Sequence, residues 1–310
     1  MFKPTDQPLR HYRTQVFDSA RWERFDDRDD DILICTSYKS GTTWMQRICA
    51  LLIFRSVELD RPMSMISPWL EIRGDSLETM LATYRAQTHR RFIKTHTPLD
   101  GLAWRPKNMH LVVVRDPRDV FMSMLNHFKN YNPETRAEFA AELRDADEAA
   151  KALPDDPNEM FQLWLTRGSF EWEVDGFPYW SVFHHARTFW ERRDRPNIAF
   201  FHYSDLQADL GLEMRRIAAA LGIDIDEDLW PALVEAATFR HMKADADRFV
   251  PESHLRMWND NRRFFNKGTS GKWQGVLSAE SLALFDHHAA EHYPPDMVAW
   301  MLDGSAAGTP

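Results

Sequence analysis

One stretch near the start of the chain combines residue types that together could bind a phosphate group. The polar loop that follows Cys35 contains Lys39, Ser40, Gly41, Thr42 and Thr43. Gly41 would let an anion approach the backbone, Lys39 would add a full positive charge, and the two threonines would add hydroxyl donors. This combination favours binding of a phosphate or a similar anion.

The elements on either side of this loop are the ones such a site needs. Residues 32–35 are apolar and rich in β-branched types, which predicts a buried strand. After the loop, apolar residues recur at helical spacing at Trp44, Ile48, Leu51 and Leu52. A helix that starts at the loop would point its free N–H groups and positive dipole end at a ligand there. The stretch predicts a phosphate cradle, with an ordinary polar strand-turn-helix as the alternative.

Two more predicted strands end in residues that could meet such an anion. Lys94 and His96 follow the short apolar pair at residues 92–93, and Arg115 follows the apolar run at residues 110–114. Open α/β sheets bind ligands at the carboxyl ends of their strands. In nucleotide triphosphatases the comparable strand ends in an aspartate that holds Mg²⁺, whereas this one ends in Arg115. Their P-loop lysine stands at the start of the helix, whereas Lys39 precedes Gly41 by two residues. The sequence therefore predicts a cationic, metal-free anion site; a structural His96 and an Arg115–Asp119 pair are the alternatives.

These strands, with a fourth at residues 197–203, predict a single α/β domain. We expect a P-loop-like, mostly parallel sheet flanked by helices on both faces. Residues 1–30 are polar and are predicted to be a solvated lead-in, and residues 31–303 form the domain. Residues 131–176 are acidic and contain several prolines, which predicts a surface excursion or lid, and residues 304–310 are predicted to be a disordered tail.

Composition restricts the class of protein. The net charge of −9 argues against a general nucleic-acid binder, because such proteins carry a basic face. Cys35 and Cys49 fall inside the first strand and helix, so we expect buried thiols in a reducing compartment. The sequence has no secretory h-region and no apolar run that approaches the ~20 residues of a membrane span. These features predict a soluble, cytoplasmic protein without a transmembrane segment.

Two patterns near the C-terminus have both a functional and an ordinary interpretation. Residues 244–276 carry Arg262, Arg263, Lys267 and Lys272 among glycines, which is typical of either a solvated turn or a mobile anion clamp. Residues 288–292 fit H-x-x-E-H, an inverted zinc-protease motif, but two prolines follow directly. A solvated helix end is the preferred interpretation of that motif, and no metal site is predicted.

With these residues laid out, the chain resembles the sulfotransferases that use 3′-phosphoadenosine 5′-phosphosulfate (PAPS), of the cytosolic and bacterial aryl or lipid type. Residues 38–44 (YKSGTTW) look like the 5′-phosphosulfate loop of that family, and residues 115–123 look like its 3′-phosphate strand-helix. Residues 264–273 (FFNKGTSGKW) are similar to its nucleotide-closing loop, and residues 94–96 match its catalytic Lys-Thr-His. All these matches occur in family order.

The resemblance implies a role for each matching residue. His96 would be the general base toward an acceptor hydroxyl or amine, Lys39 would stabilise the leaving oxygen, and Lys94 would hold the sulfuryl oxygens. The 3′-phosphate of PAPS, and of the product 3′,5′-adenosine bisphosphate (PAP), would be bound by Arg115, Ser123, Lys267 and Gly268. The adenine would be bound by Trp44, Tyr203 and Phe239. A hydrophobic hydroxylated small molecule or lipid would be the acceptor, in a pocket near residues 63–70, Phe128, residues 164–180 and Phe249.

The chain also departs from the family. Asn266 stands where arginine is frequent, so Arg262 or Arg263 would have to replace that contact. The dimerisation motif of animal cytosolic members is absent from residues 274–283, which leaves the oligomeric state open. A nucleotide-dependent kinase of related fold and a nucleotide-binding module without turnover are the alternative functions.

Overall fold

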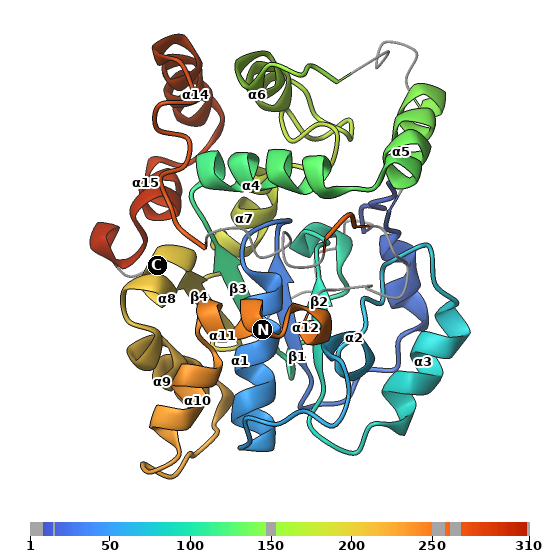
Figure 1. Ribbon diagram of the computed structural model, residues 1–310, viewed down its shortest axis with the longest axis vertical. Helices are drawn as coiled ribbons and strands as arrows, with labels where there is room; N and C mark the ends of the chain where they lie inside the picture. Colours follow the sequence, from blue (N-terminus) through green and yellow to red (C-terminus); the bar gives the residue numbers. More distant parts are fainter. Residues whose placement is uncertain (1–8, 15, 147–152, 250–257, 261–267, 309–310) are drawn as a thin grey trace.

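Four strands form one parallel sheet, in the order β2-β1-β3-β4 (Figure 1). The computed structural model describes residues 9–14, 16–146, 153–249, 258–260 and 268–308. The strands are β1 (Ile32–Thr36), β2 (Phe92–Thr95), β3 (Met109–Val114) and β4 (Ile198–His202). Cys35 pairs with both Thr95 and Val112, so the carboxyl ends of β1, β2 and β3 lie at the same edge.

Side chains alternate along each strand between two layers of helices. Ile32 and Ile34 pack in one apolar cluster, whereas Leu33 and Cys35 pack in the other. The first layer contains α1 (Thr42–Phe54), α2 (Met63–Ile66), α8 (Tyr203–Ala208), α9 (Leu210–Leu221), α10 (Trp230–Ala236), α11 (Phe239–Ala244) and α12 (Ala246–Phe249). The second contains α3 (Leu77–Ala86), α4 (Pro117–Asn130), α6 (Pro157–Thr166), α7 (Val182–Trp190), α14 (Ala279–His292) and α15 (Pro295–Asp303).

The predicted fold is confirmed: a parallel sheet carries helices on both faces (Figure 1). The remaining elements are α5 (Pro133–Ala146) and the short 3₁₀ helices η1 (Ser19–Arg24), η2 (Leu99–Gly101) and η4 (Gly304–Ala307). The prediction of a surface excursion over residues 131–176 was wrong for α6, because its apolar face belongs to the core. The residues that α6 buries are Met160, Phe161, Trp164 and Leu165.

The N-terminal segment is part of the core, so the prediction of a solvated lead-in was wrong for its described residues. Four aromatic side chains of this segment are buried: Tyr12, Phe17, Trp22 and Phe25. Phe17 forms a bridge with Ile72, and the Arg73 amide donates to the Val16 carbonyl at 2.9 Å. The sequence pattern did not indicate this burial, because polar residues separate the aromatic ones and the segment has no helical or strand periodicity.

Two C-terminal predictions also need correction. The tail was expected to be disordered from residue 304, yet residues 304–307 form η4, and Ser305 bonds Asp205 through its amide and its hydroxyl. The H-x-x-E-H motif is not a fully solvated helix end, because His288 is buried and its Nε2 lies 2.9 Å from Asp175 Oδ2. Tyr293 donates to the same Asp175 oxygen at 2.5 Å. This carboxylate therefore connects α14 to the loop before α7.

The opposite edge of the sheet depends on one buried ion pair. Asp31 immediately precedes β1 and Arg91 immediately precedes β2, and both side chains are almost fully buried. Arg91 donates from Nε to Asp31 Oδ1 at 2.7 Å and from a second nitrogen to Oδ2. Its guanidinium also lies over the Phe25 ring, 4.8 Å from the centroid. The pair joins the amino ends of two neighbouring strands to the N-terminal segment.

We predict that Arg91→Ala lowers the free energy of unfolding by about 3–5 kcal/mol, because it leaves the Asp31 charge buried without a partner. Arg85→Ala is the matched control, since Arg85 pairs with Asp26 at 2.8 Å but both side chains are exposed. That change should cost less than about 1 kcal/mol. Urea unfolding of both variants measures the difference, and equal losses would contradict a special role for the buried pair.

Candidate active site

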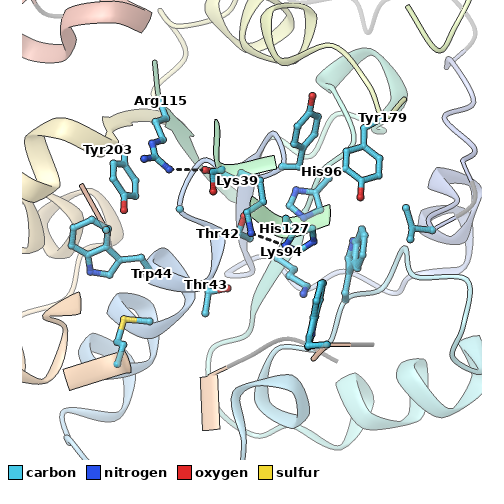
Figure 2. A pocket seen from close by; sticks show the side chains of 18 of the residues that line it. Lys39, Thr42, Thr43, Trp44, Lys94, His96, Arg115, His127, Tyr179 and Tyr203 are labelled. Atoms are coloured by element: carbon cyan, nitrogen blue, oxygen red, sulfur yellow. Dashed lines mark hydrogen bonds between the residues drawn. The ribbon is translucent and has the colours of Figure 1, made fainter. Parts of the chain in front are cut away.

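A cavity opens at the edge where β1, β2 and β3 end, and it collects most of the predicted site residues (Figure 2). Of the predicted residues, those that line it are Lys39, Gly41, Thr42, Thr43, Trp44, Lys94, His96, Arg115, Ser123, Tyr203, Phe239 and Gly268. Ser40 does not line the cavity, because its hydroxyl is buried against Ser37 Oγ at 2.7 Å. Lys267, Asn266, Arg262 and Arg263 lie outside the described residues.

The loop after β1 is shaped for close approach of a ligand to its backbone. Gly41 precedes the first residue of α1 at φ 109°, in the left-handed region that favours glycine. A Cβ at this position would also come within 3.1 Å of the Tyr203 ring. Thr42, Thr43 and Trp44 line the cavity, so the amino end of the 13-residue helix α1 faces it. Free N–H groups and the helix dipole therefore favour an anion here.

Arg115 approaches the same space from the end of β3 (Figure 2). Its terminal nitrogens donate to the carbonyls of Lys39 and Thr269, each at 3.3 Å, and its guanidinium lies over the Tyr203 ring at 4.1 Å. Its Nε is buried and has no hydrogen-bond partner among the described residues. Asp119, the alternative partner, instead accepts hydrogen bonds from the amides of Gly271 and Lys272. Arg115 is thus held in place with donor capacity left for a ligand.

An aromatic recess lies beside Arg115. The rings of Trp44 and Tyr203 meet edge to face at 5.3 Å, and Trp44 is fixed by a 2.8 Å hydrogen bond from Nε1 to the Ala237 carbonyl. Phe239 lines the same recess, and a Cβ on Gly268 would come within 2.7 Å of its ring. Only a glycine can therefore pack this closely against Phe239. The recess can accept a flat ring next to an arginine.

His96 is held as a neutral base at the end of β2. Its Nδ1 lies 2.8 Å from the Thr36 carbonyl, an acceptor only, so Nδ1 carries the proton and Nε2 carries the lone pair. Burial lowers the pKa of His96 to about 4, with further lowering by Lys94 and Lys39, while Glu71 and the Thr36 hydrogen bond act in the opposite direction. At neutral pH, His96 can therefore take up a proton at Nε2.

Two lysines flank this base. Lys39 Nζ lies 3.0 Å from His127 Nδ1, and the pKa of Lys39 is lowered to about 7 by burial and by the charge of Arg115 (Figure 2). Lys94 places its ammonium group 5.1 Å from the centre of the Trp69 ring. An anion bound between these side chains would supply the negative charge that the cavity lacks.

The far end of the cavity is aromatic, in partial agreement with the predicted acceptor pocket. Among the predicted ranges, Trp69, Tyr179 and Trp180 line it. Phe128 is absent from this lining and stacks on Tyr179, and Phe249 is buried in the other helical layer. Tyr38 and Lys272 also line it, and they belong to the predicted nucleotide loops at residues 38–44 and 264–273. The lining residues that the sequence analysis did not find are Val16, Ile72, His127, Tyr131, Met242 and Trp258. His127 could have been found, because it stands four residues after Ser123 on the same helix.

Comparison with protein families gives one match that covers most of the chain. Residues 29–294 match the model of the sulfotransferase domain. A glycolipid sulfotransferase from Mycobacterium bovis (strain BCG / Pasteur 1173P2) is 36% identical over 307 residues, covering 94% of this chain and 94% of the relative. Sulfotransferase 1E1 from Cavia porcellus is 26% identical over 280 residues, covering 86% and 84% of the two chains.

Solved structures show the same fold. Mouse sulfotransferase SULT7A1 complexed with PAP superposes with a TM-score of 0.66 at 21% identity, over 88% of each chain. Retinol dehydratase in complex with androsterone and inactive cofactor PAP superposes with a TM-score of 0.67 at 20% identity, over 92% of this chain and 89% of that one. The fold is therefore shared far beyond the range of close sequence similarity.

We predict that His96 stays neutral in the folded protein at pH 6, because its pKa is lowered to about 4. A nuclear magnetic resonance titration of labelled histidines measures this, with the urea-unfolded chain, whose histidines titrate near pH ~6.5, as the reference. The Nδ1–H tautomer should show in the ring ¹⁵N shifts at neutral pH. Protonation of His96 near pH 6.5 in the folded protein would contradict the prediction.

Proposed function

The chain belongs to the sulfotransferase family, whose members use PAPS as the sulfuryl donor, and we propose that its acceptor is a hydroxyl group of a glycolipid or a related amphipathic lipid. One observation carries the proposal: a neutral base, His96, opens into a cavity that four basic side chains line, Lys39, Lys94, Arg115 and Lys272. The relative from Mycobacterium bovis at 36% identity, a glycolipid sulfotransferase, supports the lipid acceptor.

The residues present fit PAPS. Arg115 has a buried Nε free to donate, and the amino end of α1 faces the cavity. The described lining residues include no aspartate or glutamate that could bind a metal ion. This lining suits an anion whose charge is neutralised by the protein's own cations. The nucleotide would supply a sulfuryl group on a phosphate leaving group. We assign Arg115, Ser123 and Gly268, together with Lys267, to its 3′-phosphate, and Trp44, Tyr203 and Phe239 to its adenine.

The side chains then divide the chemistry. His96 Nε2 takes the proton of the acceptor hydroxyl as that oxygen forms its bond to sulfur. Lys39 stabilises the negative charge on the oxygen whose bond to sulfur breaks, and Lys94 and the α1 amides stabilise the sulfuryl oxygens. The cavity holds the base, the cations and the acceptor in the correct orientation. The reaction therefore avoids the entropic cost of bringing these groups together from solution.

The aromatic end of the cavity suits an amphipathic acceptor. Tyr38, Tyr131 and Tyr179 place polar hydroxyls beside apolar ring faces, with the Tyr131 and Tyr179 hydroxyls bonded to each other and that of Tyr38 accepting from Trp164 Nε1. Val16 and Ile72 add aliphatic surface. This combination can contact both the polar head and the apolar part of a lipid. No helix among the described residues has the length and apolar character to cross a bilayer, and we propose a cytoplasmic location in line with the buried free thiols Cys35 and Cys49.

We predict that PAP raises the melting temperature far more than ADP, because ADP lacks the 3′-phosphate that Arg115 would bind. PAP at ~100 times its Kd should add about 2.7 kcal/mol, a shift of several degrees for a chain of this size. Differential scanning fluorimetry with PAP, ADP and ATP–Mg²⁺ measures the shifts. Arg115→Met should remove most of the difference between PAP and ADP.

Sulfuryl transfer is then tested with PAPS and a panel of glycolipids, hydroxylated lipids and phenols. His96→Ala should bind PAP normally and lose transfer about 10²- to 10⁴-fold. Stabilisation by ATP–Mg²⁺ without stabilisation by PAP would favour the kinase alternative. A His96→Ala variant that binds PAP and leaves all measured activity unchanged would favour a nucleotide-binding module without turnover.

We predict that PAP binds more weakly as the pH rises above about 7, because the pKa of Lys39 in the free protein is lowered to about 7. A bound phosphate favours the charged amine and raises that pKa, so binding at pH 8.5 must take up a proton, whereas at pH 6 Lys39 already carries it. Isothermal titration calorimetry in buffers of different protonation enthalpy measures the uptake.

Lys39→Arg is the control for this experiment, because arginine stays charged over the whole range. The phosphates of PAP titrate near pH ~6 themselves, so the variant also supplies the baseline for their contribution. Equal proton uptake by the wild type and by Lys39→Arg at pH 8.5 would show that Lys39 does not titrate on binding.

A further inference from the structure

A fully buried carboxylate lies directly behind the catalytic strand end. Glu71, in the loop between α2 and α3, has no exposed surface. Its Oε2 accepts from the His96 amide at 2.9 Å and from Trp69 Nε1 at 2.8 Å. Its Oε1 accepts from Trp22 Nε1 at 2.7 Å and from the hydroxyls of Thr97, at 2.6 Å, and Thr95. One side chain thus contacts the N-terminal segment, the cavity wall and the end of β2.

The set of partners is the one that an ionised carboxylate binds. Two indole N–H groups and one backbone N–H can only donate. Thr95 Oγ1 accepts a hydrogen bond from the Thr97 amide at 3.1 Å, so its own proton is left for Glu71. An ionised carboxylate is an acceptor only, and it satisfies this whole set of donors. A buried negative charge therefore lies under the site.

Glu71 fixes the geometry of the base and of its neighbour. The hydrogen bond to its amide ties down the backbone of His96, and Thr95 and Thr97 on either side are bound to the same carboxylate. Trp69 is bound through Nε1, and its ring meets the His96 ring edge to face, with centroids 5.0 Å apart. The orientation of His96 is therefore set by Glu71 on one side and by the Thr36 carbonyl on the other.

The charges that act on His96 give Glu71 a second role. His185 from α7 is neutral, because burial lowers its pKa to about 3, whereas Lys94 from β2 and Lys39 from the loop after β1 oppose a positive charge on His96. Glu71 favours that charge, as does the hydrogen bond to the Thr36 carbonyl. During transfer His96 must become an imidazolium ion between these cations. A buried carboxylate close by lowers the cost of that state.

We propose that Glu71 is a positioning residue for sulfuryl transfer, which holds His96 and Trp69 in place and stabilises the protonated imidazole while the acceptor oxygen attacks. The role in transfer rests on the proposed function, whereas the coupling of Glu71 to His96 is a property of the unliganded protein. Glu71 has no contact with the acceptor or the nucleotide in this role, because it is buried behind Trp69 and the backbone of β2.

The test compares Glu71→Gln with Trp22→Phe. The glutamine keeps the size of the side chain and removes its charge, whereas Trp22→Phe removes one donor to Glu71 and leaves the charge. Histidine resonances of each unliganded protein are followed from pH 8 to about 4.5, with circular dichroism to confirm folding. In the wild type and in Trp22→Phe, the His96 signal should begin to move below about pH 5. In Glu71→Gln it should not move in this range, because loss of the carboxylate charge lowers the pKa of His96 by about one unit or more.

The kinetic readout separates positioning from general stability. Glu71→Gln should lower kcat about tenfold or more, the equivalent of one pKa unit at the base, while the Kd of PAP is unchanged. Trp22→Phe should lower stability and keep kcat within about twofold, since one neutral hydrogen bond is lost and the charge remains. If Glu71→Gln does not fold, Glu71→Asp replaces it, and it should move the His96 titration in the same direction by less.

Each outcome decides the matter. Coincident His96 titrations in Glu71→Gln and the wild type would overturn the proposal, and so would an equal shift in Trp22→Phe, which would reduce Glu71 to a structural role. A shifted titration in Glu71→Gln, in a protein whose wild type transfers no sulfuryl group to any acceptor, would keep the coupling and reject the proposed function instead.

Discussion

Parallel pairing of β1 with both β2 and β3 is the constraint on which the site depends. The pairing puts Thr36, Thr95 and Val114 at one edge of the sheet, and the loops that follow carry Lys39, His96 and Arg115. Each of these side chains is too short to reach a common ligand from any other edge. The Asp31–Arg91 pair joins the amino ends of β1 and β2, so it also helps to fix the register that brings the carboxyl ends of these two strands together.

Concentrating cations in an acidic protein has an electrostatic cost, and the structure shows how it is distributed. Burial lowers the pKa of Lys39, and the charge of Arg115 lowers it further. His96 avoids a third charge by remaining neutral, with its proton on the nitrogen that faces Thr36. An anionic ligand relieves this repulsion. Binding of an anion in the cavity therefore lowers the electrostatic free energy of the protein.

The sequence was informative where local patterns determine structure. Strand ends, the glycine before α1 and the Lys-Thr-His triplet could be predicted because each depends on residues adjacent in the chain. The buried N-terminal segment could not, since its aromatic residues show no periodicity and their partners, such as Ile72 and Glu71, are distant in sequence. Glu71 itself carried no signal: a single glutamate among apolar residues looks the same whether it is solvated or buried under five donors.

The walls of the cavity come from separate parts of the chain, and this division has an evolutionary consequence. Strand ends of the central sheet supply the base and the cations, whereas Val16, Trp69, Tyr179 and Trp258 at the aromatic end belong to segments between or outside the strands. Substitutions in those segments can reshape the space for the acceptor without moving the reacting groups. Duplicated genes for such a protein can therefore diverge in the molecules they modify while they inherit the same chemistry, one residue change at a time.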